Sequence, residues 1–165
     1  MNPLLQDAAR IVLVGAGATA LMDLWLALLR RLKVRSLDMA LIGRWAGHLA
    51  QGRWSHEAIA KSAPVPHEAA LGWWVHYGVG LVFAALLVAL CGTTWLHQPA
   101  LLPALVFGAC TVAVPLFVMQ PSMGAGIASS KTATPLANCL KSLATHTVFG
   151  VGLFVSALLI ERTLP

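Results

Sequence analysis

Six polar side chains stand inside or at the edge of hydrophobic stretches, and their types could do proton chemistry. They are Asp23, Glu68, His76, Tyr77, Gln120 and His146. Histidine has an ordinary pKa near 6.5, so an imidazole beside a carboxylate can pass a proton at physiological pH. His76 is the most conspicuous of them, because the stretch "GWWVHYGVG" (72–80) otherwise has the composition of a membrane-spanning helix.

Composition indicates the surroundings in which these groups must work. Of the 165 residues 58% are hydrophobic and only 10% are charged, against ~25% charged in soluble domains. Residues 69–130 contain no Asp, Glu, Lys or Arg. A surface that contacts lipid tails needs no charged side chains, whereas a surface in water does. The chain is therefore predicted to be an integral membrane protein.

Four apolar stretches are long enough to cross a bilayer core, which takes ~20 helical residues. They cover residues 11–29, 70–91, 101–119 and 143–160. None alternates between polar and apolar residues, so helices are predicted and a barrel is excluded. We expect an all-α membrane protein that forms a single four-helix transmembrane domain over residues 1–165.

The segment between the first and second stretches is predicted to carry an interfacial helix. The sequence "GRWAGHLAQGRW" (43–54) repeats G-R-W nine residues apart, which on a helix would place Trp45 and Trp54 on opposite faces. Tryptophan and arginine favour the level of the lipid head groups.

Basic residues predict the orientation. The 30–69 connection holds seven of the eleven Lys and Arg residues, the 120–142 connection holds two, and each end of the chain holds one. By the positive-inside rule, the 30–69 and 120–142 connections are cytoplasmic and both termini are periplasmic.

This orientation places several polar residues at one depth. Asp23, His76 and His146 fall within ~10 Å of the inner boundary at a rise of 1.5 Å per residue. Gln120 ends the third stretch nearby, and Glu68 enters the second stretch eight residues before His76. An ionised Asp near mid-bilayer costs ~2.5–3.5 kcal/mol, so such groups usually pair inside the bundle. We expect His76 to meet Asp23 and His146; the alternative is that these groups only hydrogen-bond the helices together.

Two glycine motifs resemble ligand-binding loops. "VLVGAGATA" (12–20) matches the dinucleotide fingerprint and Asp38 follows it, but that fingerprint requires a strand, a turn and a helix; Gly15 and Gly17 are interpreted as small residues that let helices approach closely. "QPSMGAGIASSKTATP" (120–135) could form an anion-binding nest, although a tight re-entry turn is favoured.

The segment "SHEAIAKSAPVPHE" (55–68) holds two His-Glu pairs, which are the residue types that bind zinc. Neither pair has the helical metal-motif spacing, and Pro64 and Pro66 interrupt any common helix. No metal site is predicted there, and the positive charge beside the spans is not interpreted as a nucleic-acid site.

Four motifs in order, "LIGRWAGHL", "LGWWVHYGVGLVFAALL", "QPSMGAGIASS" and "SLATHTVFGVGL", resemble the family known as domain of unknown function 2938. The resemblance covers nearly the whole chain. It implies a small bacterial inner-membrane protein of four helices and no assigned activity.

Three functions remain open from the residues. The first is a transporter of a small solute or of protons, working as a homodimer because four helices enclose little volume. The second is a membrane-embedded enzyme or carrier in which His76 and His146 bind haem or a metal, and the third is a scaffold without chemistry. The expected partners are lipids and a small solute or protons, and the cofactor is unknown.

Overall fold

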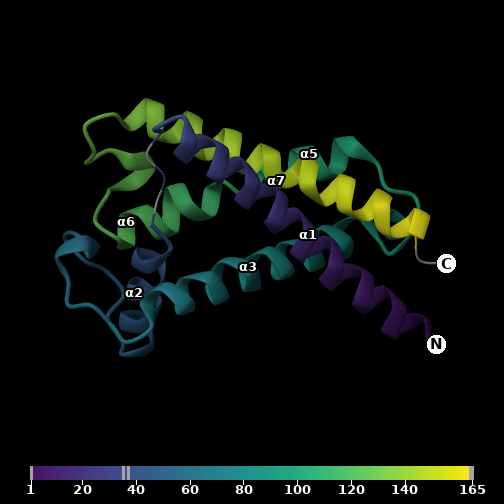
Figure 1. The fold of residues 1–165 in the computed structure, drawn as a ribbon, viewed down its shortest axis with the longest axis horizontal. Helices are drawn as coiled ribbons and strands as arrows, with labels where there is room; N and C mark the ends of the chain where they lie inside the picture. The colour runs from purple at the N-terminus through teal and green to yellow at the C-terminus, as the bar shows by residue number, and fades with distance from the viewer. Residues whose placement is uncertain (1, 35, 37, 164–165) are drawn as a thin grey trace. The chain divides into compact units, whose positions relative to one another are not determined.

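The computed structural model describes residues 2–34, 36 and 38–163, and these residues form helices with no strand among them (Figure 1). The helices are α1 (Pro3–Arg31), α2 (Met39–Ala50), η1 (Ile59–Lys61), α3 (Glu68–Cys91), α4 (Thr94–His97), α5 (Leu101–Cys110), η2 (Pro115–Met119), α6 (Gln120–Ser122), η3 (Ile127–Ser129) and α7 (Pro135–Thr163). The predicted all-α fold is confirmed.

Within the described residues, four helices are long and apolar enough to cross a membrane. Three are α1, α3 and α7, and the fourth is the run Leu101–Ser122 that comprises α5, η2 and α6. Each contains one of the predicted apolar stretches. The helices extend beyond these stretches because polar residues continue them: the Asn2 side chain accepts from the Leu4 N–H at the start of α1, and Arg30 and Arg31 favour its C-terminal end.

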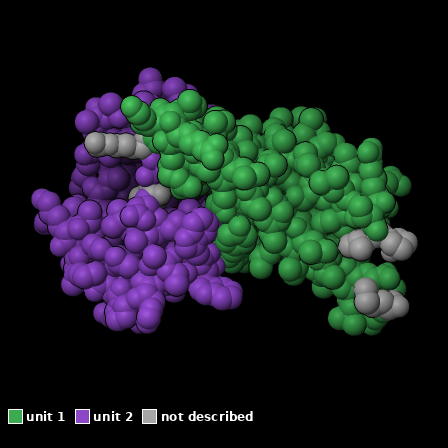
Figure 2. Space-filling view, in the orientation of Figure 1, with its two compact units in different colours: residues 1–34, 77–111, 144–165 green, residues 35–76, 112–143 purple. Residues whose placement is uncertain are grey.

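The chain divides into two compact units (Figure 2). Unit 1 comprises residues 1–34, 77–111 and 144–165, and unit 2 comprises residues 35–76 and 112–143.

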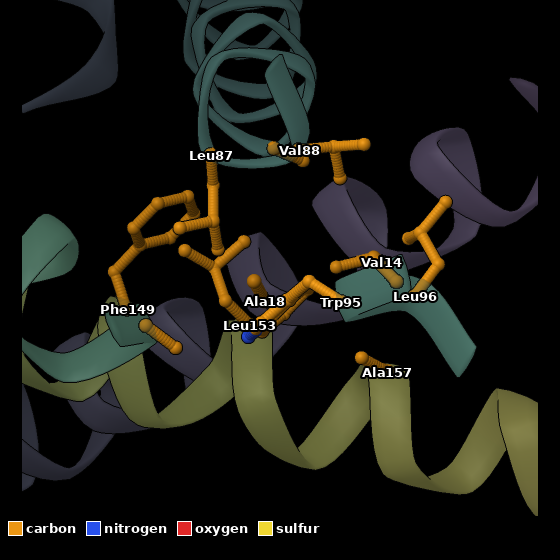
Figure 3. Packing of buried hydrophobic residues seen from close by; sticks show 11 residues of the cluster. Val14, Ala18, Leu87, Val88, Trp95, Leu96, Phe149, Leu153 and Ala157 are labelled. Atoms are coloured by element: carbon orange, nitrogen blue, oxygen red, sulfur yellow. The ribbon is translucent and has the colours of Figure 1, made fainter. Parts of the chain in front are cut away.

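The core of unit 1 lies between α1, α3 and α7 and the short helix α4. Figure 3 shows Leu87 and Val88 of α3 with Phe149 and Leu153 of α7, and the same cluster includes Val14 of α1. Leu87 is 1% exposed and Leu153 is fully buried. In a membrane the gain from this packing is mostly van der Waals contact, because lipid tails are as apolar as leucine.

Small residues let α1 approach its neighbours within unit 1. A Cβ added at Gly15 would lie 2.9 Å from the Leu81 Cα of α3, and one added at Gly152 would lie 2.8 Å from the Ala18 Cα of α1. Gly15 and Gly17 lie in the middle of a continuous helix, where no strand or turn for a dinucleotide exists. The interpretation of these glycines as helix-packing residues is confirmed, and Asp38 instead caps α2 by accepting from the Ala40 N–H at 3.0 Å.

A polar network joins the chain's ends in unit 1. Arg10, although only 7% exposed, donates to Glu161, and His97 lies 3.3 Å from Asp7 and 3.5 Å from Glu161. The start of α1, the α4 turn and the end of α7 therefore lie together at one end of unit 1.

In unit 2, α2 packs against the start of α3. Gly43 and Gly72 are the contact points: a Cβ added at Gly43 would lie 2.6 Å from the Gly72 nitrogen. The predicted helix between the first two spans is therefore present, but it ends at Ala50. The expectation that Trp54 continues it is wrong, because Gly52 turns the chain with a φ of +81°. The Trp45 indole then donates to the Trp54 carbonyl oxygen.

Candidate functional site

Asp23 has a partner inside unit 1, and that partner is Tyr77. The Tyr77 hydroxyl donates to Oδ2 of Asp23 at 3.0 Å, in partly buried surroundings. This contact joins α1 to α3 between residues 54 positions apart. A histidine was expected as the partner of Asp23. Within unit 1 the contact is made by Tyr77, the residue that follows His76.

His146 contacts the end of α5. Its Nδ1 lies 2.7 Å from the Thr111 hydroxyl oxygen, which is also 2.6 Å from the Gly108 carbonyl oxygen. Because a carbonyl only accepts, the single hydroxyl hydrogen of Thr111 points to Gly108. His146 Nδ1 must therefore donate to Thr111, and a proton taken up by His146 goes to Nε2. At the residue before His146, the Thr145 hydroxyl accepts from the Trp25 indole at 3.2 Å.

The span Leu101–Ser122, the third in chain order, departs from regular α-helix at Thr111. Helix α5 ends at Cys110, a turn occupies Thr111 and Val112, and η2 is a π-helical stretch from Pro115 to Met119. Proline has no N–H, so Pro115 cannot donate to the carbonyl four residues earlier, that of Thr111. Helix breaks and π-turns at membrane depth are frequent at functional sites. Thr111 is not among the residues expected from the sequence, although Pro115, four residues later, signals the irregular backbone there.

Glu68 is engaged in an ion pair at the start of α3. Its two carboxylate oxygens accept from Nε and Nη2 of Arg44, each at 2.8 Å, and one also accepts from the Val65 N–H at 3.2 Å. The same guanidinium donates to the carbonyl oxygens of Ala60 and Ser62. The hydrogen bond from Arg44 to Glu68 is the largest cause of the raised pKa of Arg44. Glu68 thus joins α2, the 60–62 segment and α3.

Gln120 begins α6, the last part of the third span, and contacts the turn that follows it. Its side-chain oxygen accepts from the buried Ser129 hydroxyl at 2.8 Å. Gly124 and Gly126 have positive φ, and Lys131 donates its N–H to the Ala125 carbonyl oxygen. The 120–132 segment is therefore the tight turn that the sequence favours.

The two long connections meet in unit 2. His56 donates its N–H to the Ser122 carbonyl at 2.9 Å, and Ile59 donates to Met123 at 3.0 Å. A Cβ added at Gly124 would clash with the Glu57 carbonyl group, which fixes how closely these backbones approach. Connections that share backbone hydrogen bonds lie on the same side of the membrane.

His76 belongs to unit 2, where its ring packs edge-on against Trp73 with centroids 5.9 Å apart. The predicted meeting of His76 with Asp23 and His146 joins residues of both units and stays a prediction. The same holds for haem or metal binding by His76 and His146.

His48 and His56, whose contact was not expected from the sequence, form a buried pair in unit 2. Nδ1 of His48 lies 2.8 Å from Nε2 of His56. The two residues are only 5% and 6% exposed. The His-Glu pairs of the 55–68 segment are thus separated: His56 joins His48, and Glu68 joins Arg44. Across the described ranges no group of three or more His, Cys, Asp or Glu side chains is arranged to hold a metal ion.

The helices define the class: this is a multi-pass membrane protein, with four spans and polar side chains between them. Residues 12–160 match the model of the family described as protein of unknown function (DUF2938), and the chain belongs to that family. No curated protein and no solved structure matches it.

Proposed function

We propose that the chain is a proton-coupled transporter of a small solute in the bacterial inner membrane, acting as a homodimer. The observation that carries the proposal is the turn and π-helical stretch in the third span from Thr111 to Met119, beside which His146 donates to the Thr111 hydroxyl. Irregular backbone at membrane depth is tolerated where it is buried in protein or lines a path for water or solute. In many transporters the binding site is formed where a membrane helix departs from regular geometry.

Two groups supply the proton chemistry in this proposal. Asp23, with its Tyr77 partner, exchanges a proton on the carboxylate, and His146 exchanges one on Nε2. Intramembrane ionisable side chains are expensive, which is the reason that they more often serve a proton or ion path than packing alone. A scaffold would keep the helix contacts but has no need of either group.

Transport is tested with purified protein in proteoliposomes that enclose a pH-sensitive dye. External solutes are added from a panel of amino acids, polyamines, quaternary ammonium compounds and carboxylic acids. We expect at least one class to drive proton movement across the membrane, and liposomes without protein to show none. If correctly inserted protein moves protons with no class of the panel, the transporter proposal is wrong.

Orientation gives an independent expectation. Both termini should face the periplasm, because nine of the eleven basic residues lie in the 30–69 and 120–142 connections. Alkaline phosphatase, which is active only outside the cytoplasm, should be active when fused to either end, and green fluorescent protein should not fluoresce there after Sec export. The reverse pattern would place the connections outside and contradict the assignment.

A further inference from the structure

The His48–His56 pair sits where three parts of unit 2 meet. His48 comes from α2, and its Nε2 lies 3.0 Å from the Ala63 carbonyl oxygen. His56 belongs to the 52–63 segment, which is hydrogen-bonded through its backbone to Ser122 and Met123. The pair thus ties α2 to a segment that holds the turn after the third span.

Counting hydrogens shows what the pair can bind. The Ala63 carbonyl only accepts, so His48 Nε2 carries a hydrogen. A second hydrogen occupies the 2.8 Å between the two rings. Two neutral imidazoles have only these two N–H hydrogens, so Nδ1 of His56 is bare; it is buried and has no hydrogen-bond partner among the described residues.

Additional protons therefore oppose this arrangement. The first can go only to the buried Nδ1 of His56, and the second would put hydrogens on both facing nitrogens and break the bond between the rings. If the rings separate into water, each takes up a proton near pH 6.5. The closed pair binds fewer protons than the open one, so its stability is complete above about pH 6.5 and falls as the pH drops below that value.

The groups around the pair act in both directions, and burial of His56 is the largest effect. Burial lowers the pKa of His56, the Ser122 carbonyl opposes this, and Arg53 and His48 add to the lowering. The Glu68 carboxylate attracts positive charge on His48, but it is paired with Arg44, which offsets that attraction. Glu57 and Lys61 are exposed, and residues 120–126 carry no titratable side chain.

From this geometry we propose that the His48–His56 pair is a proton-operated latch, closed when neutral, whose protonation releases the 52–63 segment from the turn at residues 120–126. The latch lies in unit 2 and does not depend on the transporter proposal. It gives the basic connections of the protein a response to acid that is separate from proton exchange at the intramembrane groups.

Hydrogen–deuterium exchange of the full chain in lipid nanodiscs tests the latch at pH 7.5 and pH 5.0, with rates corrected for intrinsic exchange. One extra proton at 1.5 pH units below a pKa of 6.5 shifts an equilibrium about thirtyfold. We expect the peptide containing the His56 and Ile59 amides to exchange at least about tenfold faster at pH 5.0, while peptides from the core of α7 stay protected.

The variant pair separates the latch from general acid sensitivity. His48→Gln combined with His56→Gln should remove the pH response, and His67→Asn, at an exposed histidine with a φ of +56°, should retain it. The latch is wrong if wild-type exchange at His56 and Ile59 is the same at both pH values. It is equally wrong if the response survives in the double variant, or if α7 loses protection together with the segment. Should the double variant not fold, the wild-type comparison alone decides.

Discussion

Gly43→Ala is expected to destabilise the protein by about 3 kcal/mol, the upper range for overpacking. The added Cβ would overlap the Glu68 carbonyl oxygen. It would also lie 2.7 Å from the Glu68 carbonyl carbon and 2.6 Å from the Gly72 backbone nitrogen. All of these are backbone atoms, so no side chain can rotate away. Alanine gains only about 1 kcal/mol over glycine in a helix, and that gain is too small to compensate. Thermal denaturation in detergent micelles measures the effect.

Gly78→Ala is the matched control for this change. Gly78 is also helical, but a Cβ added there meets nothing within 4 Å. Its variant should melt at or slightly above the wild-type temperature. Equal melting temperatures for Gly43→Ala and wild type would show that α2 does not pack on α3 as closely as the structure has it.

The spans were predictable from the sequence because their cause is local. A run of apolar residues without charge can satisfy its backbone in lipid only as a helix, whatever it packs against. The asymmetry of Lys and Arg is equally local, and it predicts orientation without any contact being known. The end of α2 was placed wrongly because the G-R-W repeat outweighed Gly52, whose left-handed backbone ends the helix.

The contacts of the polar residues were harder to predict because they depend on which faces meet. The expected pairing of Asp23 with a histidine stays a prediction, and the Tyr77 hydroxyl, one residue after His76, donates to Asp23 without having been expected. One position along a helix turns a side chain by about 100°, so depth alone cannot choose between the two. The His48–His56 pair needs the fold of the 52–63 segment, which no periodicity encodes. The irregular backbone at Thr111 could have been predicted, because Pro115 lacks the N–H that a regular helix needs there.

Asp23→Asn is expected to lower solute-driven proton movement by at least about a hundredfold, the lower range for loss of a positioned proton-transfer group. Asparagine keeps the shape of the side chain and can still accept from the Tyr77 hydroxyl, but it cannot exchange a proton. Removing a charge from a span makes insertion easier, so failure to insert does not explain a loss of transport. The proteoliposome assay measures initial rates for the variant and wild type at equal amounts of inserted protein.

Two variants make the Asp23 result specific. Tyr77→Phe removes the donor but leaves the carboxylate, so we expect a partial loss whose pH profile is displaced from that of wild type. Asp38→Asn removes a carboxylate at the N-terminal cap of α2, where asparagine caps as well as aspartate; it should transport at the wild-type rate. If Asp23→Asn also transports at the wild-type rate, the carboxylate carries no proton in the cycle, and its hydrogen bond with Tyr77 serves only to hold α1 against α3.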